Sequence, residues 1–243
     1  HPSNDSLKRD DEFTPKGERY WSYKRYNQKL KNIAKTTIAL GEWEPPAVIG
    51  LCEIENIQCL KDLIYNTPLQ AFGYEIIHYE FGPESRPTRD ILYAKGLVNQ
   101  KDTLHLFINH WPSRYGGQLA TAPKREKAAQ ILKQKYDSLL TLNPLANIIA
   151  LGDFNDHPDD VSMKDNLKAK KDTINLKPDE LVNLIWHFAD QGLGTHKYQH
   201  VWGVLDQIIV TQNLVFSKNS LFASLSTAHI FKADWLLEKD DVG

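Results

Sequence analysis

The chain has 243 residues, 41% of them hydrophobic and 25% charged, a balance typical of a globular protein with a sizeable core. Its formal net charge of −2 argues against a protein that coats nucleic acid by bulk electrostatic attraction, although a local basic groove is still compatible with it. No run of 18 apolar residues occurs, so no membrane-spanning helix is predicted, and two cysteines are too few for a disulfide framework.

The first third of the sequence predicts an arm, two helices and a strand. Residues 1–20 are polar and charged, which is typical of a loop or arm. Apolar residues at three- and four-residue steps predict a helix from Trp21 to about Leu40, and the prolines that follow end it. The apolar run "AVIGLCE" (47–53) predicts a buried strand, and a second helix is predicted from Gln58 to Tyr65.

The rest of the sequence alternates strands with a long helix. Buried strands are predicted for "TLHLFINH" (103–110), for the apolar start of "NIIALGDFNDHP" (147–158) and for "VLDQIIVT" (204–211). A helix is predicted over 122–142, with Thr121 as its cap and Pro123 in its first turn. This alternation indicates a layered α/β fold, and because no linker is evident we predict a single domain over 1–243.

Polar residues cluster at the ends of these strands. Strands packed side by side would bring three carboxylates, two amides and an imidazole into one cleft. Oxygen ligands of this kind suit a hard cation such as Mg²⁺, whereas structural zinc would require Cys and His. The residues concerned are Glu53, then Asn109 with His110, then Asp153 with Asn155, and finally Asp206.

Each residue also has a structural interpretation. Glu53 can mark a strand leaving the core, and His110 can be a buried histidine whose hydrogen bonds are satisfied. Asp153 and Asn155 can form a turn by bonding nearby backbone. Asp206 is harder to explain in this way, since a carboxylate within an apolar strand must be paired or bound. Together the residues favour a functional site more strongly than any one of them does.

The backbone geometry after Gly152 determines which of the polar residues at 153–157 share a face. If the extended strand continues, Asp153 and Asn155 face one cleft and Phe154 turns back toward the core. We interpret Asp156 and His157 as the turn beyond the strand and leave them outside the site.

Four motifs occur in the order found in one known superfamily. They are "GLCEIEN" (50–56), "FINHWPSRYGG" (107–117), "IALGDFND" (149–156) and "VLDQIIV" (204–210). The set resembles the endonuclease/exonuclease/phosphatase superfamily, and the long "DDEFTPKGERYWSYKRYNQKL" segment resembles a bacterial branch of it. The resemblance implies a DNase I-like four-layered α/β sandwich, in which two packed mixed sheets are flanked by helices.

The resemblance also implies roles for five residues. Glu53 would bind the divalent metal, Mg²⁺ with Mn²⁺ as an alternative. Asp153 would orient and deprotonate the attacking water, and Asn155 would position the water or the phosphate. His110 would contact the scissile phosphate and supply a proton, and Asp206 would set the protonation of a histidine partner.

The loop after His110 supplies candidate substrate contacts. Arg114 has a fork of donors that can grip phosphate, Trp111 can stack on a base or sugar, and Ser113 and Asn109 lie beside them. An exposed, glycine-ended loop is the alternative interpretation. The leading hypothesis is a Mg²⁺-dependent phosphoester hydrolase, most simply a phosphodiesterase or nuclease. DNA, RNA, a phospholipid head group, inositol phosphates and small diesters all stay open as substrates.

Three departures from the family pattern support a rival hypothesis, a non-catalytic module that binds a phosphate-bearing ligand or nucleic acid. The family opens with a strand bearing an Asn metal ligand and closes with Ser-Asp-His, and neither motif occurs here; residues 78–90 also replace an expected pair of strands. We expect that the chain omits these pieces, since a sandwich without them would expose core and unpaired backbone. The start at His1-Pro2 leads us to expect a trimmed product, either cytoplasmic or exported.

Overall fold

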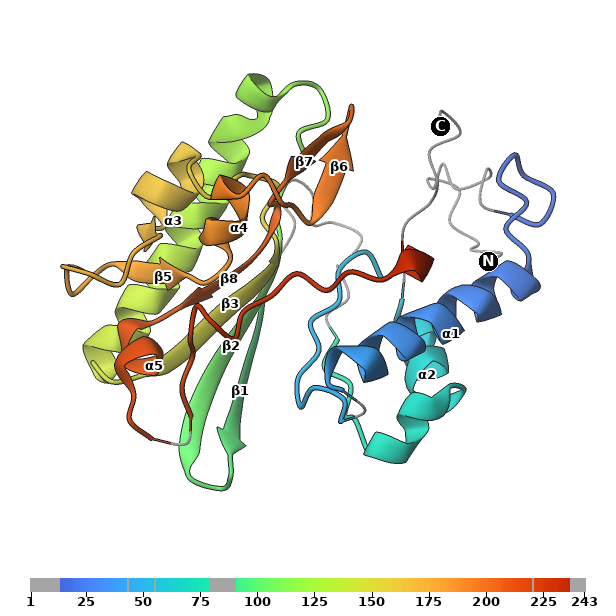
Figure 1. Cartoon of the computed structure of the whole chain (residues 1–243), viewed down its shortest axis with the longest axis horizontal. Helices are drawn as coiled ribbons and strands as arrows, with labels where there is room; N and C mark the ends of the chain where they lie inside the picture. The colour runs from blue at the N-terminus through green and yellow to red at the C-terminus, as the bar shows by residue number, and fades with distance from the viewer. Residues whose placement is uncertain (1–13, 43, 55, 79–90, 220, 237–243) are drawn as a thin grey trace. The chain divides into compact units, whose positions relative to one another are not determined.

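The computed structural model describes residues 14–42, 44–54, 56–78, 91–219 and 221–236 (Figure 1). It divides into two compact units. Unit 1 comprises His1–Ile49 and Glu53–His78, and unit 2 comprises Gly50–Cys52 and Tyr79–Gly243. The single domain expected over 1–243 stays a prediction. Most of the predicted polar arm and nearly all of the departure at 78–90 lie outside the described residues.

Unit 1 contains the two predicted helices. Helix α1 spans Tyr23–Leu40 and α2 spans Ile57–Tyr65, followed by the 3-10 helix η2 at Pro68–Phe72. Ser22 caps α1 by accepting a hydrogen bond from the Arg25 amide, and Asn56 caps α2 in the same way. The Tyr26 hydroxyl on α1 donates to Asp62 of α2 at 2.8 Å, which ties the two helices together.

The strand predicted for residues 47–53 is wrong, because these residues make no sheet ladder. The Gly50–Cys52 piece, which belongs to unit 2, instead lies close to two strands in the sheet of the same unit. A β carbon on Gly50 would lie 2.2 Å from Leu151 Cδ1, and the Cys52 thiol donates to the Asn109 carbonyl at 3.3 Å. Apolar sequence alone predicts burial, whereas a strand also needs a partner for its backbone groups.

In the described part of unit 2, six strands form one mixed sheet in the order β1-β2-β3-β8-β5-β4. Their bounds are β1 Leu92–Val98, β2 Asp102–His110, β3 Asn147–Asp153, β8 Asp206–Val210, β5 Leu181–Asn183 and β4 Ala169–Lys170. The pairs β2–β3 and β4–β5 are parallel, and the other neighbours are antiparallel. Three of the four strands predicted from the sequence are confirmed as β2, β3 and β8, the last beginning two residues later than predicted.

Shorter elements surround this sheet. Helix α3 (Gln118–Leu142) lies along one face, and the hairpin of β6 (His196–Tyr198) and β7 (Val201–Gly203) projects beyond the start of β8 (Figure 1). The remaining elements are the π-helix η3 Ser162–Asn166, the helices α4 Trp186–Asp190 and α5 Gln212–Phe216, and the 3-10 helix η4 Asp234–Leu236. The mixed α/β class is confirmed. Within the described residues, no helix is both long and apolar enough to cross a membrane.

Helix α3 fixes the face of the sheet on which the core lies. It connects the parallel strands β2 and β3, and a parallel pair requires such a crossover. Its apolar stripe, with Ala129 and Leu132, packs on Phe107, Ala150 and Ile209.

The predicted start of α3 is wrong. The helix begins at Gln118 with Gly117 as N-cap, and Thr121 lies inside it, donating to the Gly117 carbonyl at 2.8 Å. Pro123 consequently lies in the second turn. A threonine can bond the carbonyl one turn back within a helix as readily as it can cap one, so the residue type did not settle the boundary.

Candidate functional site

Three polar strand ends meet in one row across the sheet of unit 2. His110 on β2 is paired in register with Asp153 on β3, and Asp153 is paired with Asp206 on β8. Residues paired across a sheet point to the same face, so the three side chains share one surface, called here the His110 row. His110 Nε2 lies 3.8 Å from Asp153 Oδ2. The structure therefore brings these three residues together, as the sequence predicts.

Asn155 reaches the His110 row through a turn. Its φ of 51° ends the extended geometry, so the predicted strand alternation past Gly152 is wrong. The Asn155 backbone amide donates to Asp153 Oδ1 at 2.8 Å, and its side-chain amide donates to Asp153 Oδ2 at 3.2 Å and to the Trp111 carbonyl at 2.9 Å. Phe154 is fully buried, as predicted. The turn thus brings Asn155 to Asp153 and holds the carboxylate in one orientation.

Like charge accumulates on this row. The pKa of Asp206 is raised, first because surrounding protein excludes water from its carboxyl group and also because Asp153 beside it is negative. The Thr195 hydroxyl and the charge of His196 act in the opposite direction. Two carboxylates directly opposite one another destabilise a sheet, so the arrangement has an energetic cost.

The neighbouring row, called here the Asn109 row, comprises Asn109, Gly152 and Gln207 and faces the core under α3. The buried Asn109 side chain donates to the Phe107 carbonyl at 3.0 Å and accepts from Trp111 Nε1 at 3.0 Å. Gly152 has a φ of 128°, and a β carbon there would lie 2.0 Å from the Asn109 carbonyl oxygen. The Gln207 amide donates to the Asp156 carbonyl at 2.7 Å.

These contacts correct two predicted substrate contacts. Trp111 is fully buried, packs edge-on against Phe154 at 4.8 Å between ring centroids, and has its indole N–H bonded to Asn109. Asn109 is equally buried, and its amide groups bond inside the protein. Neither side chain presents a surface to a ligand. Proximity to His110 in the sequence was misleading, because successive residues of a strand point to opposite faces.

Arg114 supports the loop that carries Asn155. Its Nε donates to the Asn155 carbonyl at 2.7 Å, and one terminal nitrogen lies 2.8 Å from Asp160 and 3.3 Å from Asp156. The guanidinium group is thus engaged with the protein, and its predicted grip on phosphate stays a prediction. Ser113 is half-buried in the same loop, and its role as a substrate contact also stays a prediction.

The sequence interpretation missed the buried pair behind this loop. Arg125 Nε lies 2.6 Å from Asp156 Oδ1, and Ser162 donates to the other oxygen at 2.6 Å. Burial raises the pKa of Asp156, while the Ser162 hydrogen bond and the Arg125 charge oppose that shift. A signal existed: Arg125 stands three residues before Ala128 and seven before Leu132, on the apolar stripe of α3, where a solvated side chain is unexpected.

The predicted metal ligand, Glu53, belongs to unit 1, has a φ of 59° and is exposed. Among the described residues, no group of three or more His, Cys, Asp or Glu side chains is arranged to hold a metal ion. The described residues therefore form no closed protein cage for a metal. An open Mg²⁺ site needs only one or two protein carboxylates, with water and substrate oxygens as the other ligands, so Glu53 as metal ligand stays a prediction.

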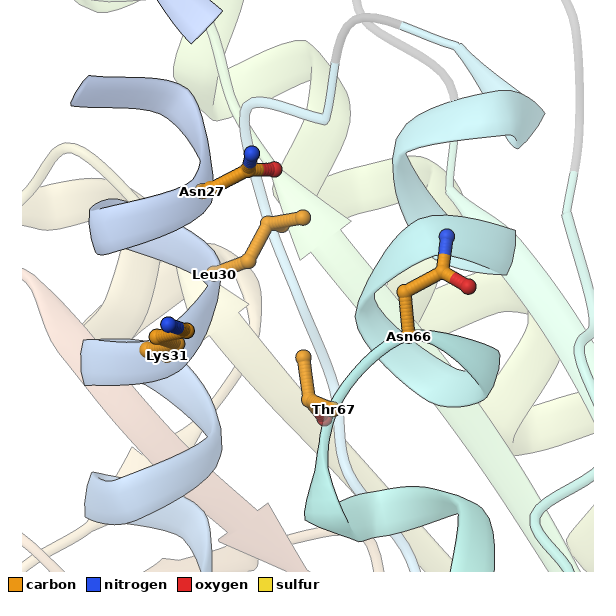
Figure 2. A pocket seen from close by; sticks show the side chains of 5 residues that line it. All are labelled: Asn27, Leu30, Lys31, Asn66 and Thr67. Atoms are coloured by element: carbon orange, nitrogen blue, oxygen red, sulfur yellow. The ribbon is translucent and has the colours of Figure 1, made fainter. Parts of the chain in front are cut away.

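Unit 1 contains a pocket of about 370 Å³ between α1 and the end of α2 (Figure 2). It is lined by Asn27, Leu30, Lys31, Asn66 and Thr67. These side chains offer amides, a hydroxyl and one cation, but neither a carboxylate nor an imidazole for proton transfer. Of these two places, only the His110 row offers groups that can transfer a proton.

Comparisons with known proteins bear on the family and the fold. A family model described as "Endonuclease/Exonuclease/phosphatase family" matches residues 2–87 and 82–242. No curated protein matches the sequence. Truncated TDP2 of Caenorhabditis elegans superposes with a TM-score of 0.50 at 12% identity, over 78% of this chain and 78% of that chain. The human Nocturnin catalytic domain with bound sulfate gives a TM-score of 0.33 at 17% identity, over 47% of this chain.

The chain spans only 37% of that Nocturnin chain. At 12% identity, the likeness to TDP2 concerns the fold alone. The family model, in contrast, covers nearly the whole sequence. A bacterial branch stays a prediction. The mixed sheet, the row of His110, Asp153 and Asp206, and the extent of the matched residues lead to one conclusion: this chain belongs to the endonuclease/exonuclease/phosphatase family.

Proposed function

We propose that this protein is a Mg²⁺-dependent phosphoester hydrolase that acts as a phosphodiesterase or nuclease. The activities in the family's name all break phosphoester bonds, which supports hydrolysis as the reaction class. The observation that carries the proposal is the His110 row, in which an imidazole and two carboxylates lie side by side at the ends of three adjacent central strands.

Asp153 is the proposed general base. Hydrolysis needs a water molecule aligned with the phosphorus atom and a group that accepts its proton. Two hydrogen bonds from Asn155 fix the Asp153 carboxylate, and Arg114 holds the Asn155 loop from behind. A base that is already oriented needs no reorganisation when the reaction occurs.

His110 is the proposed partner for the phosphate. Its Nε2 lies on the same face as Asp153, where it can donate to a non-bridging oxygen or to the leaving group. The other proposed contacts are Asn155 and Ser113 toward phosphate and Arg114 at the edge of the loop. For Asp206, the proposed role is to set the protonation of a histidine, and His196 is a histidine whose charge acts on it.

Glu53 is the proposed ligand for Mg²⁺, with Mn²⁺ as the alternative. A bound divalent cation would neutralise charge on the phosphate oxygens. The residues of the His110 row would then act on the water and the leaving group.

The test is hydrolysis of bis-p-nitrophenyl phosphate with Mg²⁺ and with EDTA. We expect Mg²⁺-dependent release of nitrophenol that Asp153→Ala abolishes. Asp159→Ala is the matched control, because Asp159 is an exposed carboxylate on the same loop. Retained activity in the Asp153 variant would contradict the assignment. An inactive wild type that still binds a phosphoester would favour the binding-module hypothesis. A panel of DNA, RNA, sphingomyelin and inositol phosphates then identifies the substrate.

A further inference from the structure

The β6–β7 hairpin exposes large side chains beside the His110 row. Tyr198 is 68% exposed, Val201 70% and Trp202 38%. A two-stranded hairpin is at best marginally stable by itself in water. Aromatic rings kept on such an element therefore indicate an interaction that covers them.

The charge of the hairpin indicates the chemistry of its partner. Residues 193–205 contain Lys197, His196 and His200 but no Asp or Glu. Lys197 Nζ lies 5.9 Å from the centre of the Trp202 ring, so cation and aromatic form one surface. Because Val201 is the hairpin's one exposed aliphatic side chain, the composition suits a polyanion that carries planar rings better than the interior of a bilayer.

The hairpin is fixed to the His110 row at its base. The Thr195 hydroxyl accepts hydrogen bonds from the amides of Leu205 and Asp206 at 3.1 and 3.0 Å. Gly203 lies so close to the His157 ring that a β carbon on it would be 2.4 Å from His157 Cε1. His157 belongs to the loop that follows Asp153. A long ligand bound to the hairpin would therefore also reach the residues of the His110 row.

The tip of the hairpin has a demanding backbone. Gln199 and His200 both have positive φ, 46° and 67°, in the two-residue turn between paired Tyr198 and Val201. Such turns favour Asn-Gly, and non-glycine residues there cost of order 1–3 kcal/mol each. The turn also means that Gln199→Asn/His200→Gly should preserve the hairpin, which makes this double variant a useful control.

We propose that the hairpin of residues 196–203 binds the single-stranded polynucleotide portion of the substrate. On one face of the hairpin, Trp202 stacks on a base and Lys197, which is paired with it, contacts the phosphate backbone. Tyr198, which is paired with Val201, stacks on a base at the opposite face. This inference rests on the proposed function, since it assigns a polynucleotide as the substrate class. Stacking on aromatic side chains tolerates any base, so the hairpin binds without sequence preference.

The experiment is fluorescence anisotropy of labelled 20-nucleotide DNA and RNA strands with the whole chain in EDTA, which separates binding from cleavage. We expect Tyr198→Ala and Trp202→Ala each to weaken binding about 5- to 150-fold, the range that corresponds to loss of one stacked base. Lys197→Gln should reduce the slope of log affinity against log salt by about 0.7, as for one phosphate contact on a single strand.

Two controls keep the result specific. Phe216→Ala removes an aromatic side chain that is 56% exposed on α5, away from the hairpin sequence, and should bind like the wild type. Gln199→Asn/His200→Gly should retain most of the affinity, because Tyr198 and Trp202 stay in place. Circular dichroism of each variant shows whether the fold is intact.

The outcomes separate this inference from the proposed function. Unchanged strand affinity in folded Tyr198 and Trp202 variants overturns the hairpin proposal, even if bis-p-nitrophenyl phosphate is hydrolysed. Lost affinity supports the hairpin, even if the wild type hydrolyses nothing. Co-sedimentation with phosphatidylcholine–phosphatidylserine vesicles is the third arm. Vesicle binding that depends on the hairpin, together with unchanged strand affinity, overturns the polynucleotide in favour of a membrane surface.

Discussion

The His110 row and the Asn109 row are built from adjacent residues of the same three strands, yet they differ in chemistry. In the Asn109 row, the amides of Asn109 and Gln207 are buried and bond to protein groups. In the His110 row, Asp153 and Asp206 set two negative charges opposite each other on a partly open face. The first arrangement stabilises the fold, whereas the second lowers stability and suggests that a ligand compensates it.

The face of the sheet on which a polar residue lies distinguishes a structural from a chemical role better than its polarity does. A polar residue at a strand end belongs to the core network if it lies on the α3 face, and to the candidate site if it lies on the other. Variants of the two rows should therefore fail in different assays, one in activity and the other in stability. The following four changes run from the largest expected effect to the smallest.

His110→Asn tests the open row directly. We expect the rate of bis-p-nitrophenyl phosphate hydrolysis to fall by about 10²- to 10⁴-fold, because the variant lacks the imidazole proposed for proton transfer. Urea unfolding should show little change in stability, since the side chain is partly exposed, at 18%, and asparagine keeps a polar group there. A variant with normal turnover would remove His110 from the mechanism.

Gly152→Ala tests the close approach of β2 and β3. The strained φ and the clash with the Asn109 carbonyl oxygen should together lower the free energy of unfolding by about 2 to 6 kcal/mol. Urea unfolding followed by circular dichroism measures this loss. Gly96→Ala is the matched control, because no atom lies within 4 Å of a β carbon at that strand position. If both variants lost the same free energy of unfolding, the close approach of β2 to Gly152 would not be the cause of the loss.

Asn109→Ala tests the closed row. It leaves the buried Trp111 indole N–H without its acceptor, which should cost about 1–3 kcal/mol of stability. Turnover by the folded fraction should fall far less than in His110→Asn. A large loss of turnover in a fully folded variant would instead restore Asn109 as a substrate contact.

Asp206→Asn tests the repulsion within the His110 row. Because the pKa of Asp206 is raised, the folded protein holds this proton more tightly than the unfolded chain does. Between the ordinary carboxyl pKa and the raised one, stability therefore falls as pH rises, and it stays lower above that range. The neutral side chain should remove this loss.

We expect the Asp206 variant to be more stable than the wild type near pH 7 by only about 0.2–1 kcal/mol. Protein shields part of the carboxyl group, but the residue as a whole is exposed, so solvent screens much of its charge. The gain should shrink toward pH 4. Urea unfolding in EDTA between pH 4 and 7 measures the difference. A gain that does not vary with pH would mean that charge is not its cause.

Much of the site was predictable because local sequence determines where strands end. The runs before His110 and Asp153 are apolar, and Asp206 begins another such run, so three polar residues had to lie at strand ends. The positions of Trp111 and Asn109 were predicted wrongly, and the buried position of Arg125 was missed. Trp111 and Asn109 depend on which face α3 covers, and Arg125 depends on a partner, Asp156, that lies 31 residues away in the sequence.

The sequence by itself determined the helices, the three central strands and the order of the motifs, because periodicity and turn residues act over a few positions. Only the tertiary structure decided the register that puts His110, Asp153 and Asp206 in one row, and the turn that brings Asn155 to Asp153. It also fixed the β6–β7 hairpin to the start of β8 through Thr195. Register depends on contacts between residues distant in the chain, and no local pattern specifies them.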